Sequence, residues 1–207
     1  MPSLPGFRVR GKLVKRRIAV FLDRDGTISE EVDYLDNPDM LRLIPRAAEA
    51  IRLINESGLL AVVVTNQSGI ARGYFTEPVL KDVHNRMELL LKAEGAHIDK
   101  IYYCPHHPEV GLPEYLLDCD CRKPRTGMIE AATKDLEIDV RGSYVVGDKI
   151  IDIELAHKAG ASGILVMTGY GREELKSLSS ERKVWPDHIA DDMYDAVKWI
   201  LSQRETG

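Results

Sequence analysis

Short runs of mostly apolar residues alternate along this chain with longer segments whose apolar residues recur every three or four positions. Runs of the first kind predict strands that are buried on both faces, as in a parallel sheet. Strands are predicted at residues 18–22, 59–64, 100–103, 143–147 and 163–167, with a marginal edge strand at 188–190. Because strands and helices alternate throughout, we expect an α/β fold with a doubly wound, mostly parallel, Rossmann-like sheet in three layers.

The segments of helical periodicity are bounded by residues that favour helix ends. Proline suits the first helical turn, hydroxyl and carboxylate side chains suit the N-cap, and glycine suits the stop. Helices are predicted from Pro45 to Gly58, from Thr76 to about Glu94, from residue 126 or 127 to 137, and after Asp191 or Asp192. His84 lies on the second of these helices and carries no motif, so we interpret it as a surface or boundary residue.

The chain is predicted to form one domain, because it contains no linker, internal repeat or low-complexity segment. Residues 29–40 are polar and are too short for a separate cap domain, so we interpret them as a flap over a site. The domain is expected at 18–207, after an N-terminal leader at 1–17. That leader is basic, which fits an anionic partner or, more simply, a solvated and partly disordered arm. Its cationic residues are Arg8, Arg10, Lys12, Lys15, Arg16 and Arg17.

Composition narrows the class of protein. The 207 residues are 44% hydrophobic and 29% charged, with a formal net charge of −5, which is ordinary for a globular protein with a real core. This charge gives no indication of a nucleic-acid or membrane-surface partner. No apolar stretch approaches the ~20 residues of a membrane span, and the N-terminus lacks the apolar segment of a signal peptide. We therefore expect a cytoplasmic protein with no nucleic-acid or membrane partner. A monomer is also expected, although nothing in the sequence determines the oligomeric state.

Carboxylates and a hydroxyl follow the first two predicted strands. Asp23 comes directly after the first strand, Asp25 follows two positions on, and Thr65 ends the second strand. Parallel sheets place their sites at this edge. Two carboxylates this close repel each other unless a cation lies between them, and Mg²⁺ prefers carboxylate and carbonyl oxygens. One carboxylate can then attack while the other handles protons, and Thr65 can hold phosphate oxygens. The alternative is a set of ordinary turn residues.

All three cysteines lie in one segment, which we name the Cys/His loop (residues 104–121). A C-x-H pair followed by a C-x-C pair supplies the four ligands of a closed, structural zinc site, predicted as Cys104, His106, Cys119 and Cys121. His107 competes with His106 for the fourth position. A disulfide would leave one cysteine over and is disfavoured in a reducing cytosol, and three free thiols are the other alternative. The loop has little apolar core, so a metal would fix its shape.

Three further charged residues follow later strands or loops. Lys123 comes directly after the Cys/His loop, where it can lie between an aspartyl nucleophile and a phosphate. Asp148 ends the fourth strand, and Asp152 lies one helical turn beyond it. Taken alone, Lys123 with Arg122 is an exposed basic pair, and Asp152 is an acid favoured by the helix dipole. A glycine-rich turn at 168–171 is a less specific candidate for contact with a substrate.

These residues occur in the order of the four motifs of the haloacid dehalogenase superfamily, which the chain resembles from Ile18 to Gly169. The motifs are Asp-Arg-Asp-Gly-Thr at 23–27, Thr65, Lys123 and Gly-Asp-x-x-x-Asp at 147–152. The resemblance implies that Asp23 is the nucleophile of an aspartyl-phosphate mechanism and that Asp25 is the acid and base. It implies a catalytic Mg²⁺ bound by Asp23, the Asp25 backbone carbonyl and Asp148, with Thr65, Asn66 and Lys123 around the phosphate.

Longer strings at 21–27, 63–73, 102–108, 119–124 and 146–149 resemble the D-glycero-D-manno-heptose-1,7-bisphosphate 7-phosphatase family. That family removes one phosphate from a sugar bisphosphate on the route to nucleotide-activated heptose for bacterial surface polysaccharide. The resemblance implies substrate contacts from Asn66, Gln67, Ser68, Arg122 and Lys149, and it supports His106 as the zinc ligand. Histidinol-phosphate phosphatases share the metal loop in a shorter form, so the fuller insert at 108–117 favours the heptose branch. A histidinol-phosphate or other sugar-phosphate phosphatase, a phosphotransferase and a binding protein without chemistry remain the alternatives.

Overall fold

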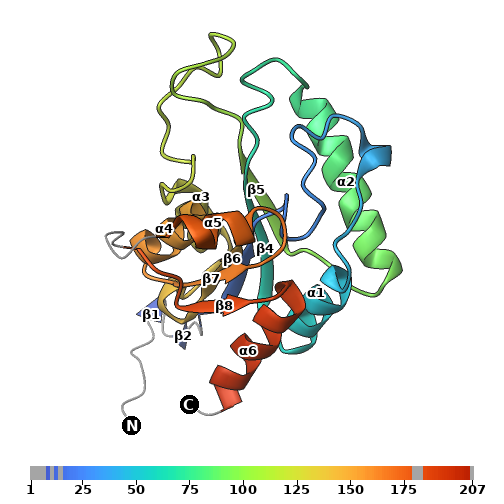
Figure 1. Cartoon of the computed structure of the whole chain (residues 1–207). Helices are drawn as coiled ribbons and strands as arrows, with labels where there is room; N and C mark the ends of the chain where they lie inside the picture. The colour runs from blue at the N-terminus through green and yellow to red at the C-terminus, as the bar shows by residue number, and fades with distance from the viewer. Residues whose placement is uncertain (1–7, 10–11, 14–15, 179–183, 206–207) are drawn as a thin grey trace.

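The computed structural model describes residues 8–9, 12–13, 16–178 and 184–205, and its centre is a six-stranded parallel sheet (Figure 1). The strand order is β5-β4-β3-β6-β7-β8, so the first long strand lies in the middle and the chain winds outward in both directions. The strands are β3 (Ala19–Leu22), β4 (Leu60–Asn66), β5 (Lys100–Cys104), β6 (Tyr144–Gly147), β7 (Ser162–Val166) and β8 (His188–Ala190). This confirms the doubly wound α/β fold.

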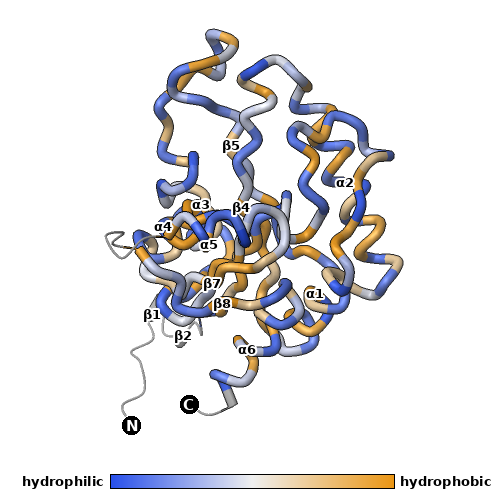
Figure 2. The backbone as a smooth tube through the Cα atoms, viewed as in Figure 1, coloured by the Kyte–Doolittle hydropathy of each residue, from blue (hydrophilic) through white to orange (hydrophobic). Residues whose placement is uncertain are grey.

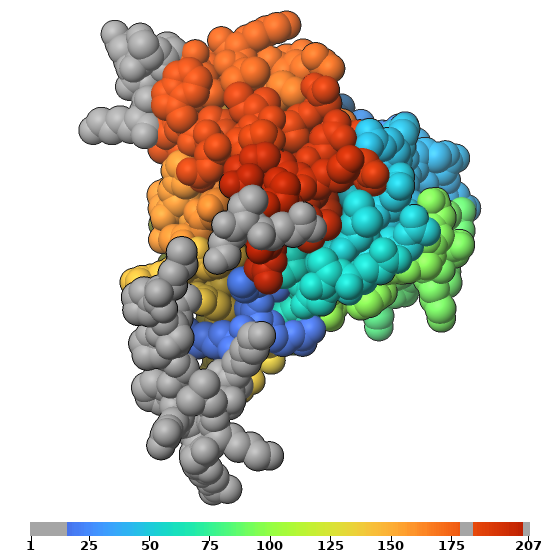
Figure 3. Space-filling model, turned by 90° about the horizontal axis from the view of Figure 1, so that it is seen from below, coloured from blue at the N-terminus to red at the C-terminus, as the bar shows by residue number. Residues whose placement is uncertain are grey.

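Helices cover both faces of the sheet, which explains why its strands are apolar at nearly every position. Val20 and Leu22 of β3 pack in one core cluster, while Ala19 and Phe21 pack in another on the opposite face. The first face is covered by α1 (Ala47–Glu56), α2 (Glu77–Ala93) and α6 (Met193–Glu205), and the second by α3 (Gly127–Leu136) and α4 (Ile150–Ala159). Figure 2 shows hydrophobic residues around the central strands, and Figure 3 shows α6 beside α1.

Several predicted boundaries shift in the structure. Helix α1 begins at Ala47 rather than at Pro45, because Arg46 adopts a left-handed backbone conformation with φ of 66°. Strand β4 continues through Thr65 and Asn66, which pair with β5. The stop after α1 is at Gly58 as predicted, with φ of 76°.

The last two helices differ in how well the sequence predicted them. Asp192 caps α6, because its Oδ1 accepts a hydrogen bond from the Asp195 N–H at 2.9 Å. Helix α5 (Gly171–Ser177), which follows the glycine-rich turn, was not predicted. None of the helices in the described ranges is both long enough and apolar enough to cross a bilayer.

The described parts of the leader form a small antiparallel pair, β1 (Arg8–Val9) and β2 (Lys12–Leu13). Arg17 exchanges backbone hydrogen bonds with Glu137 and Asp139 at the end of α3. The basic residues Arg10 and Lys15 lie outside the described residues.

Candidate active site

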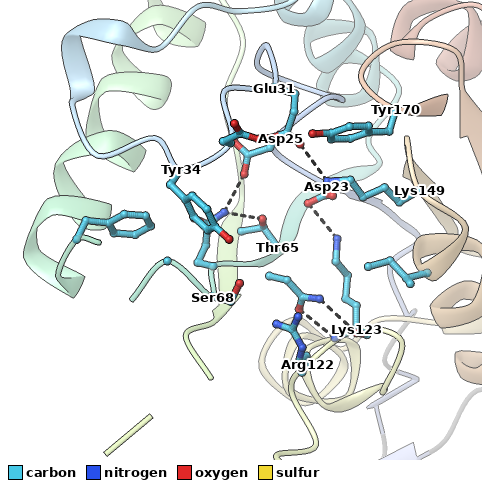
Figure 4. Close-up of a pocket in the computed structure, with 16 residues that line it drawn as sticks. Asp23, Asp25, Glu31, Tyr34, Thr65, Ser68, Arg122, Lys123, Lys149 and Tyr170 are labelled. Carbon is cyan, nitrogen blue, oxygen red and sulfur yellow. Dashed lines mark hydrogen bonds and ion pairs between the residues drawn. The ribbon is translucent and has the colours of Figure 1, made fainter. Parts of the chain in front are cut away.

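A cleft of about 280 Å³ opens at the carboxyl ends of β3, β4 and β6 (Figure 4). Parallel strands end together at this edge, so side chains that are far apart in the sequence meet there. The predicted residues Asp23, Asp25, Thr65, Lys123 and Lys149 all line the cleft. So do Asn66, Gln67, Ser68 and Arg122.

Lys123 lies between two carboxylates at the floor of the cleft. Its Nζ is 2.9 Å from Asp23 Oδ1 and 2.6 Å from Asp152 Oδ1, and all three side chains are buried. Burial acts to lower the pKa of Lys123, but the charges of Asp152 and Asp23 outweigh this and raise it. The lysine is therefore held as a cation beside the Asp23 carboxylate. Asp152 holds this lysine in place.

Asp148 has a buried carboxylate oxygen that no described residue binds. Its Oδ2 accepts a hydrogen bond from the Tyr170 N–H at 2.8 Å, but its Oδ1 has no partner among the described residues. Burial and the nearby charge of Asp23 raise the pKa of Asp148 to about 8. Oxygens of Asp23, Asp148 and Asp152 lie within 4.8 Å of one another. Since Lys123 already neutralises Asp152, the remaining pair, Asp23 and Asp148, fits a hard divalent cation.

The backbone beside Asp148 is held close by a glycine. Gly26 has φ of 77°, a conformation that favours glycine, and a Cβ there would lie 2.2 Å from Asp148 Oδ2. The Thr168 hydroxyl donates to the Gly26 carbonyl at 2.6 Å, which joins the turn after β3 to the turn after β7. The glycine of the Asp-x-Asp-Gly-Thr string therefore brings Asp25 and Asp148 to the same edge.

Asp25 is held by a buried network that the sequence analysis did not find. Arg24 donates to both carboxylate oxygens of Asp25, from Nε at 2.9 Å and from Nη2 at 2.7 Å. Gln67 Nε2 donates to Asp25 at 2.9 Å and to the Thr65 hydroxyl at 3.0 Å. Both N–H groups of the Gln67 amide thus donate within the protein, so this side chain orients Asp25 and Thr65.

The interpretation of His84 as a surface or boundary residue is wrong. Its side chain is buried, and its Nε2 lies 3.4 Å from Arg24 Nη1. Burial, and then the charge of Arg24, lower the pKa of His84 to about 3, so the ring is neutral and can accept a hydrogen bond. The helical spacing of Leu80, His84, Met87 and Leu91 placed it on the buried face of α2, and that signal could have found it.

Asn66, at the end of β4, holds the backbone of Lys123 through two hydrogen bonds. Its Oδ1 accepts from the Lys123 N–H at 3.0 Å, and its Nδ2 donates to the Lys123 carbonyl at 3.2 Å. This reciprocal pair fixes the backbone from which the Lys123 side chain reaches Asp23. The role of the Asn66 side chain in the structure is thus to place the lysine.

Charged and aromatic side chains surround the mouth of the cleft. Glu31 and Tyr34 of the flap (residues 29–40) approach from one side, and Lys149 and Tyr170 approach from the other (Figure 4). Lys149 Nζ lies 3.0 Å from Glu31 Oε2 and 4.6 Å from the centre of the Tyr170 ring. The sequence predicted a flap here but did not identify these flap residues.

The four predicted ligands of the Cys/His loop converge on one point. Cys104, His106, Cys119 and Cys121 present ligand atoms that all lie within 4.8 Å of one another. The sulfurs of Cys104 and Cys119 are 3.4 Å apart, and His106 Nδ1 is 3.4 Å from Cys121 Sγ. Bonds of ~2.3 Å at tetrahedral angles would put two thiolates about 3.8 Å apart, so the cluster fits a tetrahedral metal. The cysteines are free, so the disulfide alternative is wrong.

His107 turns away from this cluster and holds the rest of the loop. Its Nδ1 accepts hydrogen bonds from the backbone N–H groups of Glu109 and Val110, each at 3.2 Å. Its Nε2 lies 3.3 Å from Arg72 Nη2, in the turn after β4. The Arg122 guanidinium donates to the His106 carbonyl at 3.2 Å, which connects the cleft wall to the Cys/His cluster.

The chain is similar in sequence to named phosphatases. A family model described as HAD-hydrolase-like matches residues 120–196. Over 191 residues the chain is 43% identical to the D-glycero-D-manno-heptose-1,7-bisphosphate 7-phosphatase of Chlorobaculum tepidum, covering 89% of this chain and 94% of that protein. It is 42% identical over 184 residues to the D-glycero-beta-D-manno-heptose-1,7-bisphosphate 7-phosphatase of Haemophilus ducreyi, covering 88% and 97%.

The fold is also similar to that of a solved structure. The crystal structure of D,D-heptose 1,7-bisphosphate phosphatase from B. bronchiseptica, complexed with magnesium and phosphate, matches with a TM-score of 0.79 and 30% identity. The match covers 90% of this chain and 99% of that one. The likeness therefore concerns the whole fold rather than a single motif.

Proposed function

Because this chain belongs to the D-glycero-D-manno-heptose-1,7-bisphosphate 7-phosphatase family of haloacid dehalogenase-like hydrolases, we propose that it removes the 7-phosphate of that heptose bisphosphate. The chain is a phosphoric monoester hydrolase. The observation that carries the proposed substrate is the cleft itself. Asp23 lies at its floor, and the cations Arg122 and Lys149 line its wall, where a second phosphate would meet them.

In the proposed mechanism Asp23 attacks phosphorus and forms an aspartyl-phosphate. Asp25 gives a proton to the leaving sugar oxygen and then takes one from the water that hydrolyses the intermediate. Lys123, held as a cation 2.9 Å from Asp23, offsets the charge of the phosphate, and the Thr65 hydroxyl can donate to a phosphate oxygen while it accepts from Gln67. Asp23 and Asp148, with the Asp25 backbone carbonyl, would hold Mg²⁺, which would withdraw charge from the phosphate.

The substrate is tested by phosphate release from a panel of compounds. The panel holds the α and β anomers of the heptose bisphosphate, the heptose 7-monophosphate and histidinol phosphate. We expect the bisphosphate to have the highest kcat/KM, because histidinol phosphate carries a cationic amine where the bisphosphate carries its second phosphate. A higher kcat/KM with histidinol phosphate would contradict the heptose proposal. Phosphate transfer to an added alcohol in place of water would indicate a phosphotransferase.

Replacing Arg122 with alanine is expected to weaken selectivity for the bisphosphate. The loss of one charged hydrogen bond costs roughly 1.5–3 kcal/mol, which should appear in kcat/KM for the bisphosphate and not for the monophosphate. Arg46→Ala is the control, since Arg46 pairs with Asp192 and Asp195 and does not line the cleft. Equal losses with both substrates would mean that Arg122 does not contact the second phosphate.

We further propose that the metal of the Cys/His loop is structural zinc, held by four protein ligands. One equivalent of zinc is expected to co-purify, and Cys119→Ser should lower the zinc content measured by mass spectrometry. Activity should fall with it, because the loop holds the Arg122 guanidinium at the His106 carbonyl. An unchanged metal content in the Cys119→Ser protein, or a purified wild type without zinc, would contradict this assignment.

A further inference from the structure

Arg24 is buried at the base of the cleft, where charged side chains are rarely found. It is 1% exposed and is among the largest fully buried side chains of the described residues. Burial of a guanidinium is costly unless a counter-charge and hydrogen-bond acceptors surround it. Its side chain has three such partners, which are the carboxylate of Asp25, the Gln67 carbonyl at 3.1 Å and the His84 ring.

The three donors to Asp25 leave its carboxylate in one orientation. Arg24 Nε donates to Oδ1, while Arg24 Nη2 and Gln67 Nε2 both donate to Oδ2. An ionised carboxylate has about four acceptor positions, two on each oxygen. Oδ2 is therefore saturated, and Oδ1 keeps one lone pair free. Since the Asp25 side chain is 18% exposed and lines the cleft, that lone pair is the one available for proton transfer.

The far side of the guanidinium is fixed by His84 on α2, which supplies an uncharged acceptor to Nη1. Arginine keeps its proton in proteins, so it can orient Asp25 without exchanging a proton with it. The backbone N–H of Arg24 donates to Asp23 Oδ1 at 2.8 Å, and a change of side chain preserves that bond. The Arg24 side chain thus acts on Asp25 and leaves the nucleophile's backbone contact in place.

We propose that Arg24 is a positioning residue for proton transfer, which fixes the Asp25 carboxylate so that Oδ1 faces the leaving oxygen and later the water. This rests on the proposed role of Asp25 as the acid and base. Arg24 is buried and acts on the reaction only through Asp25, which faces the substrate. The bidentate contact also explains why arginine, rather than lysine, suits this position.

The test compares two substrates that differ in their need for an acid. The sugar alkoxide of the heptose bisphosphate must be protonated as it leaves, whereas the dinitrophenolate of dinitrophenyl phosphate need not be. In Arg24→Met, kcat with the bisphosphate should fall by roughly 10- to 100-fold, as expected when general acid–base catalysis is impaired. The first release of dinitrophenolate should stay within about 3-fold of wild type and appear as a burst, because hydrolysis of the intermediate has become slow.

A double-variant cycle separates this effect from general distortion. In an Asp25→Asn background, Arg24→Met should change the remaining rates by less than about 2-fold, because it acts through Asp25. Arg24→Lys, which keeps the charge but not the bidentate contact, should lie between wild type and Arg24→Met. The control is Arg46→Met, which removes an arginine paired with Asp192 and Asp195 outside the cleft and should leave all these rates unchanged.

Each other outcome overturns the inference. If Arg24→Met slows the first release of dinitrophenolate as much as it slows turnover of the bisphosphate, or costs as much in the Asp25→Asn background as alone, Arg24 does not act through Asp25. If Arg24→Met fails to fold, the same two comparisons with Arg24→Lys decide the matter. If Asp25→Asn itself keeps wild-type turnover, the proposed role of Asp25 fails, and this single-variant result is distinct from a failure of the cycle.

Discussion

The Asp23→Asn protein is expected to fold normally and to lose turnover by on the order of 10⁴-fold or more, as when other catalytic nucleophiles or bases are removed. An amide is a poor nucleophile and a poor ligand for Mg²⁺. The fold should survive because the asparagine Oδ1 can still accept from the Arg24 N–H and from Lys123 Nζ, which lie 2.8 and 2.9 Å from Asp23 Oδ1. Phosphate release and thermal unfolding measure the two effects separately.

Asp135→Asn provides the matched control for that variant. Asp135 is exposed on α3, where it pairs with Lys100 and Tyr102 away from the cleft, so its amide should leave turnover unchanged. A second observation identifies the atom that water attacks when the intermediate is hydrolysed. In water labelled with oxygen-18, attack at phosphorus puts the label in the released phosphate and none in Asp23, and this is the expected result. Label in the Asp23 carboxylate after a single turnover would instead mean attack at its acyl carbon. An Asp23→Asn enzyme with more than about a tenth of wild-type turnover would show that Asp23 is not the nucleophile.

The sheet was predictable because strands that are buried on both faces appear in the sequence as uninterrupted apolar runs. Ala19–Leu22 and most of Leu60–Asn66 are apolar without interruption, and such runs have few alternatives in an alternating α/β chain. The end of β4 was less predictable, because Thr65 and Asn66 look like turn residues. Their backbones nevertheless pair with β5, and this pairing depends on the neighbouring strand rather than on side-chain polarity.

The residues of the candidate site that come directly after a strand were predictable from the sequence. Asp23 and Asp148 were placed in this way, and the close spacing of the cysteines and His106 predicted that these four side chains converge. Arg24 could not be placed, because an arginine in a turn is usually exposed and its burial depends on Gln67 and His84 from other elements. The orientation of the arginine depends on contacts with residues that are distant in the sequence. The string Asp-Arg-Asp alone therefore does not predict it.

Replacing Lys123 with methionine is expected to destabilise the protein as well as to abolish turnover. The ammonium group lies 2.9 Å from Asp23 and 2.6 Å from Asp152, and its removal leaves two buried carboxylates without their cation. Loss of one partner of a buried ion pair lowers the free energy of unfolding by on the order of 3–5 kcal/mol. Denaturant unfolding in the absence of added Mg²⁺ should show this as a lower midpoint with an unchanged slope.

A second substitution separates the two roles of the lysine. In Lys123→Met with Asp152→Asn, the amide removes one uncompensated charge and can still accept the Lys149 N–H bond that Asp152 Oδ2 accepts at 3.3 Å. Much of the lost stability should return, because the buried carboxylate at 152 is gone. Turnover should not return, because no cation then offsets the charge of the phosphate beside Asp23. Lys100→Met is the control, since its exposed pair with Asp135 should contribute only about 0–1 kcal/mol. Recovery of turnover together with stability would mean that Lys123 serves only to neutralise Asp152, and an unfolding midpoint equal to wild type in the single variant would mean that the buried pair contributes nothing to the fold.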